Sequence, residues 1–243
     1  MTLKFTILGC GSSGGVPRPA LGWGVCDPSN PKNRRRRTSL LVERHNGDGA
    51  TRVLVDTSPD LRALFIKRRR RVDVYLDEPT AKVMRARFGY CFQSPPGSEY
   101  PPIVNEHRLE PGQRVTVNGE GGDITALPFL QEHGDIPSLG FRFGGLAYSC
   151  DLSNLPEESV SALTGIKVWI VDALRYRPHP SHFSVEDALT WIERIQPGRA
   201  ILTNLHSDLD YDELRTKLPP HVEPAFDGLT IDLTIDLAGA GQP

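Results

Sequence analysis

The chain has 243 residues, of which 38% are hydrophobic and 24% are charged, and its formal net charge is −2. This composition is typical of a soluble globular protein, and the small negative charge excludes a general affinity for nucleic acid or for anionic membranes. No apolar run reaches the length of a membrane span, and the first residues lack the pattern of a signal peptide. The four cysteines form no CxxC pair, which predicts free thiols and a cytoplasmic protein.

The first quarter of the chain predicts three strands and one long loop. Lys4–Leu8 reads as a strand, and Ser39–Glu43 and Arg52–Asp56 read as a hairpin across an Asn-Gly turn. The loop between them begins GCGSSGG, but no helix pattern follows, which excludes a dinucleotide-binding motif. A loop of this length is usually functional, and the basic run Arg34–Arg37 within it is either a solvated face or a phosphate-binding segment.

The next part of the chain is less regular. Leu61–Arg71 predicts a short basic helix or a connector, Val72–Leu76 a strand and Glu78–Phe88 a helix. Gly89–Pro102 is rich in proline and aromatic residues, which predicts an exposed loop that serves as a lid or as the contact of a homodimer.

The rest of the chain passes from strands to alternating strands and helices. The sequence GFRFGGLAYS alternates around a Gly-Gly turn and predicts a hairpin. Strands are further predicted at Val115–Val117, Ile124–Pro128, Val168–Asp172 and Ala200–Thr203, and helices at Pro156–Leu163, Val185–Ile195 and Tyr211–Lys217. This order predicts an αββα sandwich, formed as a single domain over residues 1–243.

Ligand-competent side chains collect where predicted strands end. These are Asp56, His133, Asp151 and His206, and the loop RPHPSH adds His179 and His182. Strand ends on one edge of a sandwich converge, and histidines with carboxylates suit a hydrolytic divalent metal site. Each residue alone has a simpler explanation, because an aspartate before a helix is often just its cap. The six together favour the metal site.

Several motifs carry a family resemblance. They are LGCGSSGGVP, CDPSNPKNRRRRTS, VLVDTSPDLR, RARFGYCF, EHGDIPSLGFRFGGLAYSCD, VWIVDALRYRPHPSHFS, ILTNLHSDLDY and PAFDGL. Over nearly its whole length the chain resembles metallo-β-lactamase-fold hydrolases, and more narrowly their phosphoribosyl 1,2-cyclic phosphate phosphodiesterase branch. The resemblance implies a dinuclear centre, of manganese or zinc, that binds a phosphodiester and an attacking hydroxide.

The resemblance also implies roles for individual residues. His133 and His206 correspond to ligands of the two metals and Asp151 to their bridging carboxylate, although Asn204 stands where some relatives have a histidine. His182 corresponds to the residue that gives a proton to the leaving oxygen. Around them, Arg35, Arg36 and Arg37 would bind the phosphate, and Asp56 and His179 would act as supporting groups or substitute ligands.

One departure from the family is large. The H-x-H-x-D-H loop that supplies most of the metal ligands in the family is absent from the sequence. VDTSPDLR runs directly into ALFIKRRRR, which predicts that one strand–loop–helix unit has been deleted after residue 62. If Asp151 bridges two metals, each metal keeps only two ligands, so we expect weak or no dinuclear binding and impaired activity.

The lead hypothesis is a metal-dependent phosphodiesterase that acts on a small cyclic or nucleotide-like phosphodiester. The alternative is a catalytically inactive remnant that binds a nucleotide or phosphate through Arg34–Arg37. A lactamase or thiol-ester hydrolase on the same fold is a third interpretation. The arginine-rich loop suits phosphate better than a β-lactam, and a fold alone does not fix a substrate.

Overall fold

A computed structural model describes residues 2–56, 71–94, 96–99 and 101–234. The chain divides into two compact units, the first formed by Met1–Asp56 with Arg114–Pro243 and the second by Thr57–Gln113. A single domain over residues 1–243 stays a prediction.

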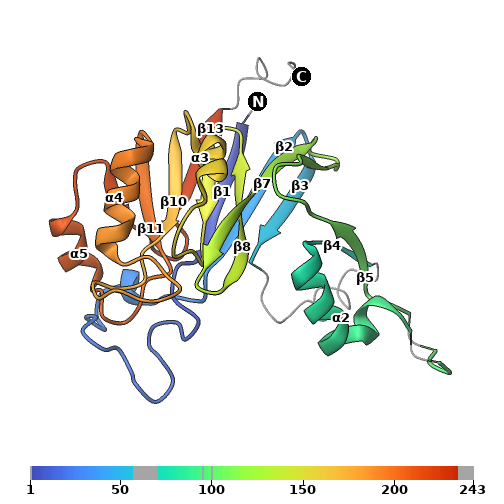
Figure 1. The fold of residues 1–243 in the computed structure, drawn as a ribbon, viewed down its shortest axis with the longest axis horizontal. Coiled ribbons are helices and arrows are strands. Elements are labelled where there is room, and N and C mark those ends of the chain that lie inside the picture. The colour runs from blue at the N-terminus through green and yellow to red at the C-terminus, as the bar shows by residue number, and fades with distance from the viewer. Residues whose placement is uncertain (1, 57–70, 95, 100, 235–243) are drawn as a thin grey trace. The chain divides into compact units, whose positions relative to one another are not determined.

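The first unit contains a sheet of four antiparallel strands in the order β13-β1-β2-β3 (Figure 1). The strands are β1 (Thr2–Gly9), β2 (Ser39–Asn46), β3 (Gly49–Val55) and β13 (Thr230–Thr234). The predicted hairpin of β2 and β3 is present, and both strands run further toward the turn than predicted, because Arg44 pairs with Thr51 and Asn46 with Gly49. A short 3-10 helix, Pro31–Asn33, interrupts the long loop before β2.

The second sheet of this unit has seven strands in the order β12-β11-β10-β9-β8-β7-β6. Its strands are β6 (Val115–Val117), β7 (Ile124–His133), β8 (Ile136–Phe143), β9 (Leu146–Ser149), β10 (Val168–Asp172), β11 (Arg199–Thr203) and β12 (Val222–Pro224). β6 to β9 pair antiparallel and β9 to β12 pair parallel. The predicted Gly-Gly hairpin is the β8–β9 connection.

The two faces of β10 explain the layers of this unit. Val168 and Ile170 belong to a buried cluster with Phe5, Val42 and residues of both sheets, so one face of β10 packs between the sheets. Trp169 and Val171 belong to a second cluster, which includes buried residues of the three helices. The helices are α3 (Glu157–Leu163), α4 (Val185–Ile195) and α5 (Tyr211–Lys217), and Figure 1 shows α4 beside β10 and β11. The predicted α/β sandwich is confirmed.

The second unit contains a parallel pair of strands, β4 (Val72–Leu76) and β5 (Val104–Arg108), joined through α2 (Glu78–Phe92). Asp77 caps α2 by accepting a hydrogen bond from the Thr80 amide (3.1 Å). The helix was predicted to end at Phe88, where the backbone does leave helical geometry (φ −131°, ψ 35°), but helical structure continues to Phe92. β5 was not predicted, because VNEHR has no apolar alternation.

Part of the sequence prediction lies outside the described residues. The segment Leu61–Arg71 and the junction after residue 62 fall almost entirely within residues 57–70. Among the helices of the described ranges, none combines the length and the apolar character that crossing a membrane requires.

The N-terminus of α4 provides a test of the fold. Ser184 is 2% exposed and forms a capping box with Asp187, in which the serine hydroxyl accepts from the Asp187 amide (3.1 Å) and the carboxylate accepts from the Ser184 amide (2.9 Å). Ser184→Ala is expected to lower the free energy of unfolding by about 1 kcal/mol, measured by urea denaturation. Ser161→Ala, which removes an exposed hydroxyl from α3, is the control and should change it by less than about 0.5 kcal/mol. Equal effects of the two changes would contradict the capping role.

Candidate metal centre

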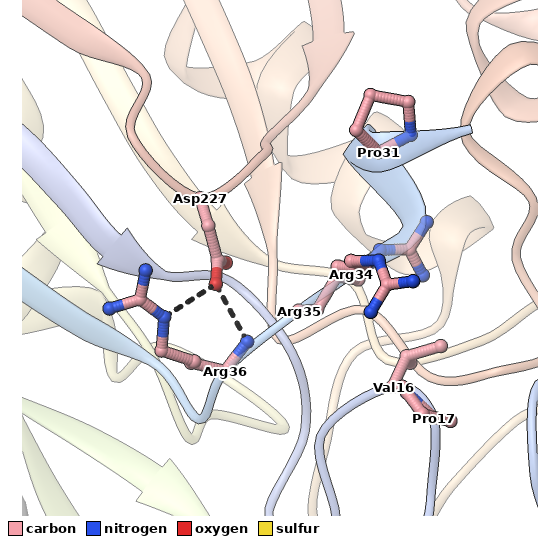
Figure 2. A pocket seen from close by; sticks show the side chains of 7 residues that line it. All are labelled: Val16, Pro17, Pro31, Arg34, Arg35, Arg36 and Asp227. Carbon is pink, nitrogen blue, oxygen red and sulfur yellow. Dashed lines mark hydrogen bonds and ion pairs between the residues drawn. The ribbon is translucent and has the colours of Figure 1, made fainter. Parts of the chain in front are cut away.

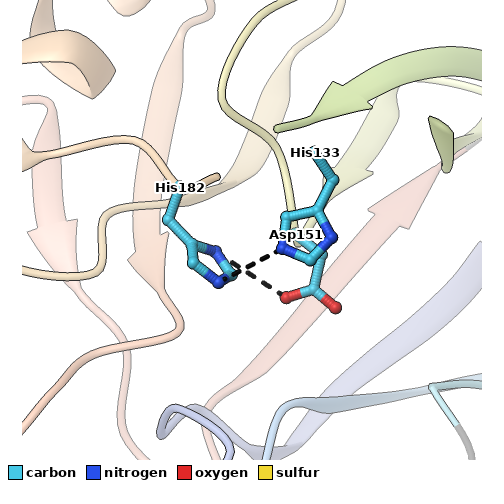
Figure 3. Close-up of side chains that lie close together, drawn as sticks. All are labelled: His133, Asp151 and His182. Atoms are coloured by element: carbon cyan, nitrogen blue, oxygen red, sulfur yellow. Dashed lines mark hydrogen bonds and ion pairs between the residues drawn. The ribbon is translucent and has the colours of Figure 1, made fainter. Parts of the chain in front are cut away.

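Three side chains that could hold a metal ion converge in the first unit. His133 is the last residue of β7, Asp151 follows β9, and His182 lies in the loop between β10 and α4. One ligand atom from each lies within 4.8 Å of the others. Figure 3 shows the two imidazole rings and the carboxylate pointing toward one another. The sequence predicted all three for the site, and the fold brings them together.

The distance between the two imidazoles suits a single ion. The Nε2 atoms of His133 and His182 are 3.3 Å apart, and the Asp151 carboxylate lies beside the same ring, 3.9 Å from the other nitrogen of His182. Two nitrogens bound to one tetrahedral zinc at about 2.0–2.1 Å lie about 3.3–3.4 Å from each other. The two imidazoles are therefore separated as two ligands of one ion would be. Three protein ligands with one further position open is the arrangement of catalytic zinc sites.

A buried carboxylate orients His182. Asp172, the last residue of β10, is fully buried, and its Oδ2 lies 2.7 Å from His182 Nδ1. The same carboxylate accepts hydrogen bonds from the Leu152 amide (3.3 Å) and from Asn204 Nδ2 (3.1 Å). With Nδ1 committed to Asp172, the Nε2 atom of His182 is the one left to face His133. Such a carboxylate behind a histidine is a common support of metal ligands.

Burial and neighbouring charges set the protonation of these groups. Burial raises the pKa of Asp172 to about 6, while the hydrogen bond and the charge of His182 act in the opposite direction. Burial also acts to lower the pKa of His182, but the hydrogen bond and charge of Asp172 outweigh it, so that pKa is raised. The pKa of His133 is lowered, mainly by burial. His133 is thus the more readily available neutral ligand.

Backbone contacts fix the strand ends that carry the site. The Glu132 amide donates to Asn154 O (3.0 Å) and the Ser153 amide donates to Glu132 O (2.6 Å), which ties the end of β7 to the segment after Asp151. The Phe183 amide donates to Leu152 O (2.8 Å), which ties the His182 loop to the same segment. Three segments far apart in sequence are therefore held in register at one place.

Three polar residues turn the chain where strands end. Asp56, Asp151 and Asn204 have φ angles of 59°, 55° and 61°, and they lie just after β3, β9 and β11. Aspartate and asparagine are among the few non-glycine residues that adopt this left-handed conformation readily. Their presence at these strand ends therefore has a conformational reason as well as a chemical one.

The structure does not place His206 with the three converging residues. Its Nδ1 pairs with Asp208 Oδ2 (3.1 Å), its Nε2 contacts the Arg18 guanidinium, and its amide donates to Leu174 O (3.0 Å). As a metal ligand it stays a prediction from the sequence. Its observed neighbours are an aspartate and an arginine.

Asp56 and His179 also stand apart from the three. Asp56 is exposed and accepts a hydrogen bond from the Tyr148 hydroxyl (2.6 Å). His179 Nδ1 lies 3.2 Å from Ser181 Oγ, and its ring centroid is 5.1 Å from that of His182. Neither donates an atom to the group around His133, so their supporting roles stay predictions.

The three arginines predicted to bind phosphate have different surroundings. Arg35 is 3% exposed, and its guanidinium donates to Leu209 O (2.7 Å), His206 O (3.0 Å) and Asn33 Oδ1 (3.0 Å). Arg36 Nε pairs with Asp227 (3.3 Å), while Arg37 is exposed. Figure 2 shows Arg34, Arg35, Arg36 and Asp227 around a cavity of about 410 Å³. Arg35 therefore has a structural role, because its buried guanidinium joins the long loop to the segment after β11.

Comparison with known proteins places the chain in a family. The model of the beta-lactamase superfamily domain matches residues 55–204, which is more than half of the chain. The chain belongs to the beta-lactamase superfamily, and its fold is the metallo-β-lactamase fold. The matched span includes His133, Asp151 and His182.

Solved structures share this fold. A diphosphatase of the PhnP family is 27% identical, with a TM-score of 0.82 over 98% of this chain and 99% of that one. Zinc-bound PqqB from Methylobacterium extorquens is 16% identical, with a TM-score of 0.67 over 95% of this chain and 100% of that one. The second likeness shows the fold alone.

A curated relative matches most of the chain. An octanoyltransferase of Porphyromonas gingivalis is 30% identical over 261 residues, covering 93% of this chain. The chain spans about half the length (51%) of that relative. Because the aligned stretch is longer than the 243 residues of the chain, the relative has residues there with no counterpart in this sequence. The deletion of a unit after residue 62 stays a prediction.

Sequence reasoning did not assign Asp172 or Asn204 to the site. The signal for Asp172 was available, because VWIVD is a buried strand that ends in an acid. The contact of this acid with His182, ten residues away, depends on the path of the loop between them. Asn204 was noted only as standing in place of a histidine, and its amide in fact holds Asp172.

The geometry predicts the metal content. After loading with manganese or zinc and dialysis, we expect about one ion per chain by elemental analysis. His133→Ala and His182→Ala should each lose it, since two ligands remain. His206→Ala should retain it, and so should the control His45→Ala, which alters an exposed histidine of β2. About two ions per chain, or loss of metal in His206→Ala, would support the ligand set that the family resemblance implies instead.

The contact between Asp172 and His182 leads to a prediction about metal affinity. Asp172→Asn keeps the size of the side chain but has one acceptor oxygen for three donors, so His182 loses its fixed orientation. The dissociation constant for zinc, from competition with a chelating dye, should rise about 10–100-fold. An unchanged constant at an unchanged free energy of unfolding would show that Asp172 does not orient a ligand.

Proposed function

We propose that the chain is a metal-dependent phosphodiesterase that acts on a small cyclic or nucleotide-like phosphodiester. The observation that supports this most is the convergence of His133, Asp151 and His182 in front of the buried Asp172. A diphosphatase in the same superfamily, similar over almost the whole chain, supports chemistry at phosphorus. The metal would be manganese or zinc.

The residues present have separate tasks in this proposal. His133, Asp151 and His182 would hold one divalent ion, which supplies Lewis-acid polarisation of a phosphoryl oxygen and lowers the pKa of bound water. The Asp172 carboxylate accepts a hydrogen bond from the Nδ1–H group of His182, and this contact keeps Nε2 of His182 directed at the metal centre. In this arrangement His182 serves as a ligand in place of the proton-donating role that the family resemblance implies, because one Nε2 lone pair cannot do both.

Hydrolysis of bis(p-nitrophenyl) phosphate tests the proposal. Protein loaded with manganese or zinc should release p-nitrophenol, and EDTA should abolish the release. His133→Ala and His182→Ala should lower kcat/KM by at least about 100-fold, because they disrupt the metal centre. His45→Ala should have the wild-type rate. Turnover that is unchanged by EDTA and by both site variants would refute a metal-dependent reaction at this centre.

The second candidate function is an inactive remnant that binds a nucleotide or phosphate without metal. The cavity of about 410 Å³ beside Arg34 and Arg36, together with the absent histidine loop, favours it. Calorimetry with AMP in EDTA separates the two candidates. Binding that persists in EDTA and is lost in Arg34→Ala, together with no turnover, would support the remnant.

A further inference from the structure

A second cavity of the first unit, of about 340 Å³, is lined by Val25, Arg175, Tyr176, Arg177 and Asp208. Three of these residues belong to the loop between β10 and α4 that also carries His182. The cavity therefore shares a structural element with the metal centre. Its volume falls within the range of about 300–1,000 Å³ that is usual for small-molecule sites.

Arg175 connects this cavity with the segment that carries His182. The Val185 amide donates to Arg175 O (3.0 Å) and the Leu174 amide donates to Phe183 O (2.9 Å), so the chain at Arg175 runs beside the residues that follow His182. Arg175 is held in place, because its Nε donates to Arg177 O (3.3 Å) and its Nη2 to Pro178 O (3.1 Å). A fixed cation thus lies next to the segment of the metal centre.

The cavity combines opposite charges. The Arg177 guanidinium has no carboxylate partner among the residues that the structure describes, so its charge is available to an anion. Asp208 pairs with His206, which in turn contacts Arg18. Guanidinium groups bind phosphate oxygens, whereas a carboxylate accepts hydrogen bonds from hydroxyl or amino groups. A ligand that is anionic throughout, such as pyrophosphate, fits this cavity poorly, because the Asp208 carboxylate in its lining would repel it.

Two exposed apolar side chains complete the lining. Tyr176 is 39% exposed and Val25 is 62% exposed, and the ammonium of Lys217 lies 4.9 Å from the centre of the Tyr176 ring. An exposed aromatic ring in a basic cavity is a surface on which a nucleobase can stack. A phosphate group, hydroxyl groups and a planar base occur together in a nucleotide.

We propose that the cavity lined by Arg175, Tyr176, Arg177, Val25 and Asp208 binds the nucleoside part of the substrate, with Tyr176 and Arg177 determining specificity. This rests on the proposed function, and it narrows the substrate class to nucleotides. The base lies on Tyr176 and Val25, the ribose hydroxyls face Asp208, and the two guanidinium groups neutralise the phosphate that leads toward His182.

Binding tests this without turnover. Calorimetry with manganese present compares AMP with inorganic phosphate on wild-type protein and on Tyr176→Ala, Arg177→Ala, Arg34→Ala and Arg52→Ala. AMP should bind at least about tenfold more tightly than phosphate, and Tyr176→Ala and Arg177→Ala should each remove about tenfold of that affinity. Arg52→Ala, an equal charge change on β3, should stay within twofold. Equal binding of AMP and phosphate, or loss of AMP binding in Arg34→Ala instead, would overturn the proposal.

Kinetics separates this inference from the proposed function. The p-nitrophenyl ester of thymidine 5′-phosphate carries a nucleoside, and methyl p-nitrophenyl phosphate carries a methyl group in its place. Wild-type protein should prefer the nucleoside ester in kcat/KM, and Tyr176→Ala should reduce that preference about tenfold, whereas Arg52→Ala should leave it within twofold. Equal effects on both substrates would overturn the cavity assignment. If neither diester is hydrolysed, the proposed function fails, while selective AMP binding that depends on Tyr176 and Arg177 still supports the cavity.

Discussion

The contact between Asp172 and His182 is the interaction on which the site depends. Asp172 is placed by β10, a strand buried on both faces, so its carboxylate cannot move toward water. Burying a carboxylate is costly unless it is fully hydrogen-bonded, and here His182, Asn204 and the Leu152 amide supply the donors. The orientation of His182, and with it the geometry of the metal centre, follows from this requirement.

The absence of the histidine loop changes the expected chemistry of the centre without removing it. From the sequence, two metals would keep only two ligands each, so we expected weak or no dinuclear binding. The arrangement of His133, Asp151 and His182 instead offers one set of three donors. A chain without this loop still offers a candidate site, because His133, Asp151 and His182 come from other strand ends of the same sandwich. A single-ion site retains polarisation but gives up the charge that a second ion would contribute.

Much of the fold and part of the site could be predicted from the sequence. The buried strands VWIVD and AILT and the helices at Val185–Ile195 and Tyr211–Lys217 were placed correctly, since their signals are local. β5 was missed because its five residues are mostly polar and it pairs with a distant strand. Arg35 was predicted to bind phosphate because its basic run follows a Gly-rich loop and because the family resemblance implies it. Only the structure shows that its guanidinium donates to carbonyls of the segment after β11.

The sequence by itself determined the α/β sandwich, the family and the candidate donors at strand ends, because periodicity and turn residues act over a few positions. Only the tertiary structure decided which donors meet. His133, Asp151 and His182 are separated by 18 and 31 residues, and their convergence depends on strand order and on the hydrogen bonds that join their loops. The same packing directs His206 toward Arg18 and Asp208. The spacing of these residues in the sequence does not show which side chains will meet, because their contacts depend on the path of the chain between the strands.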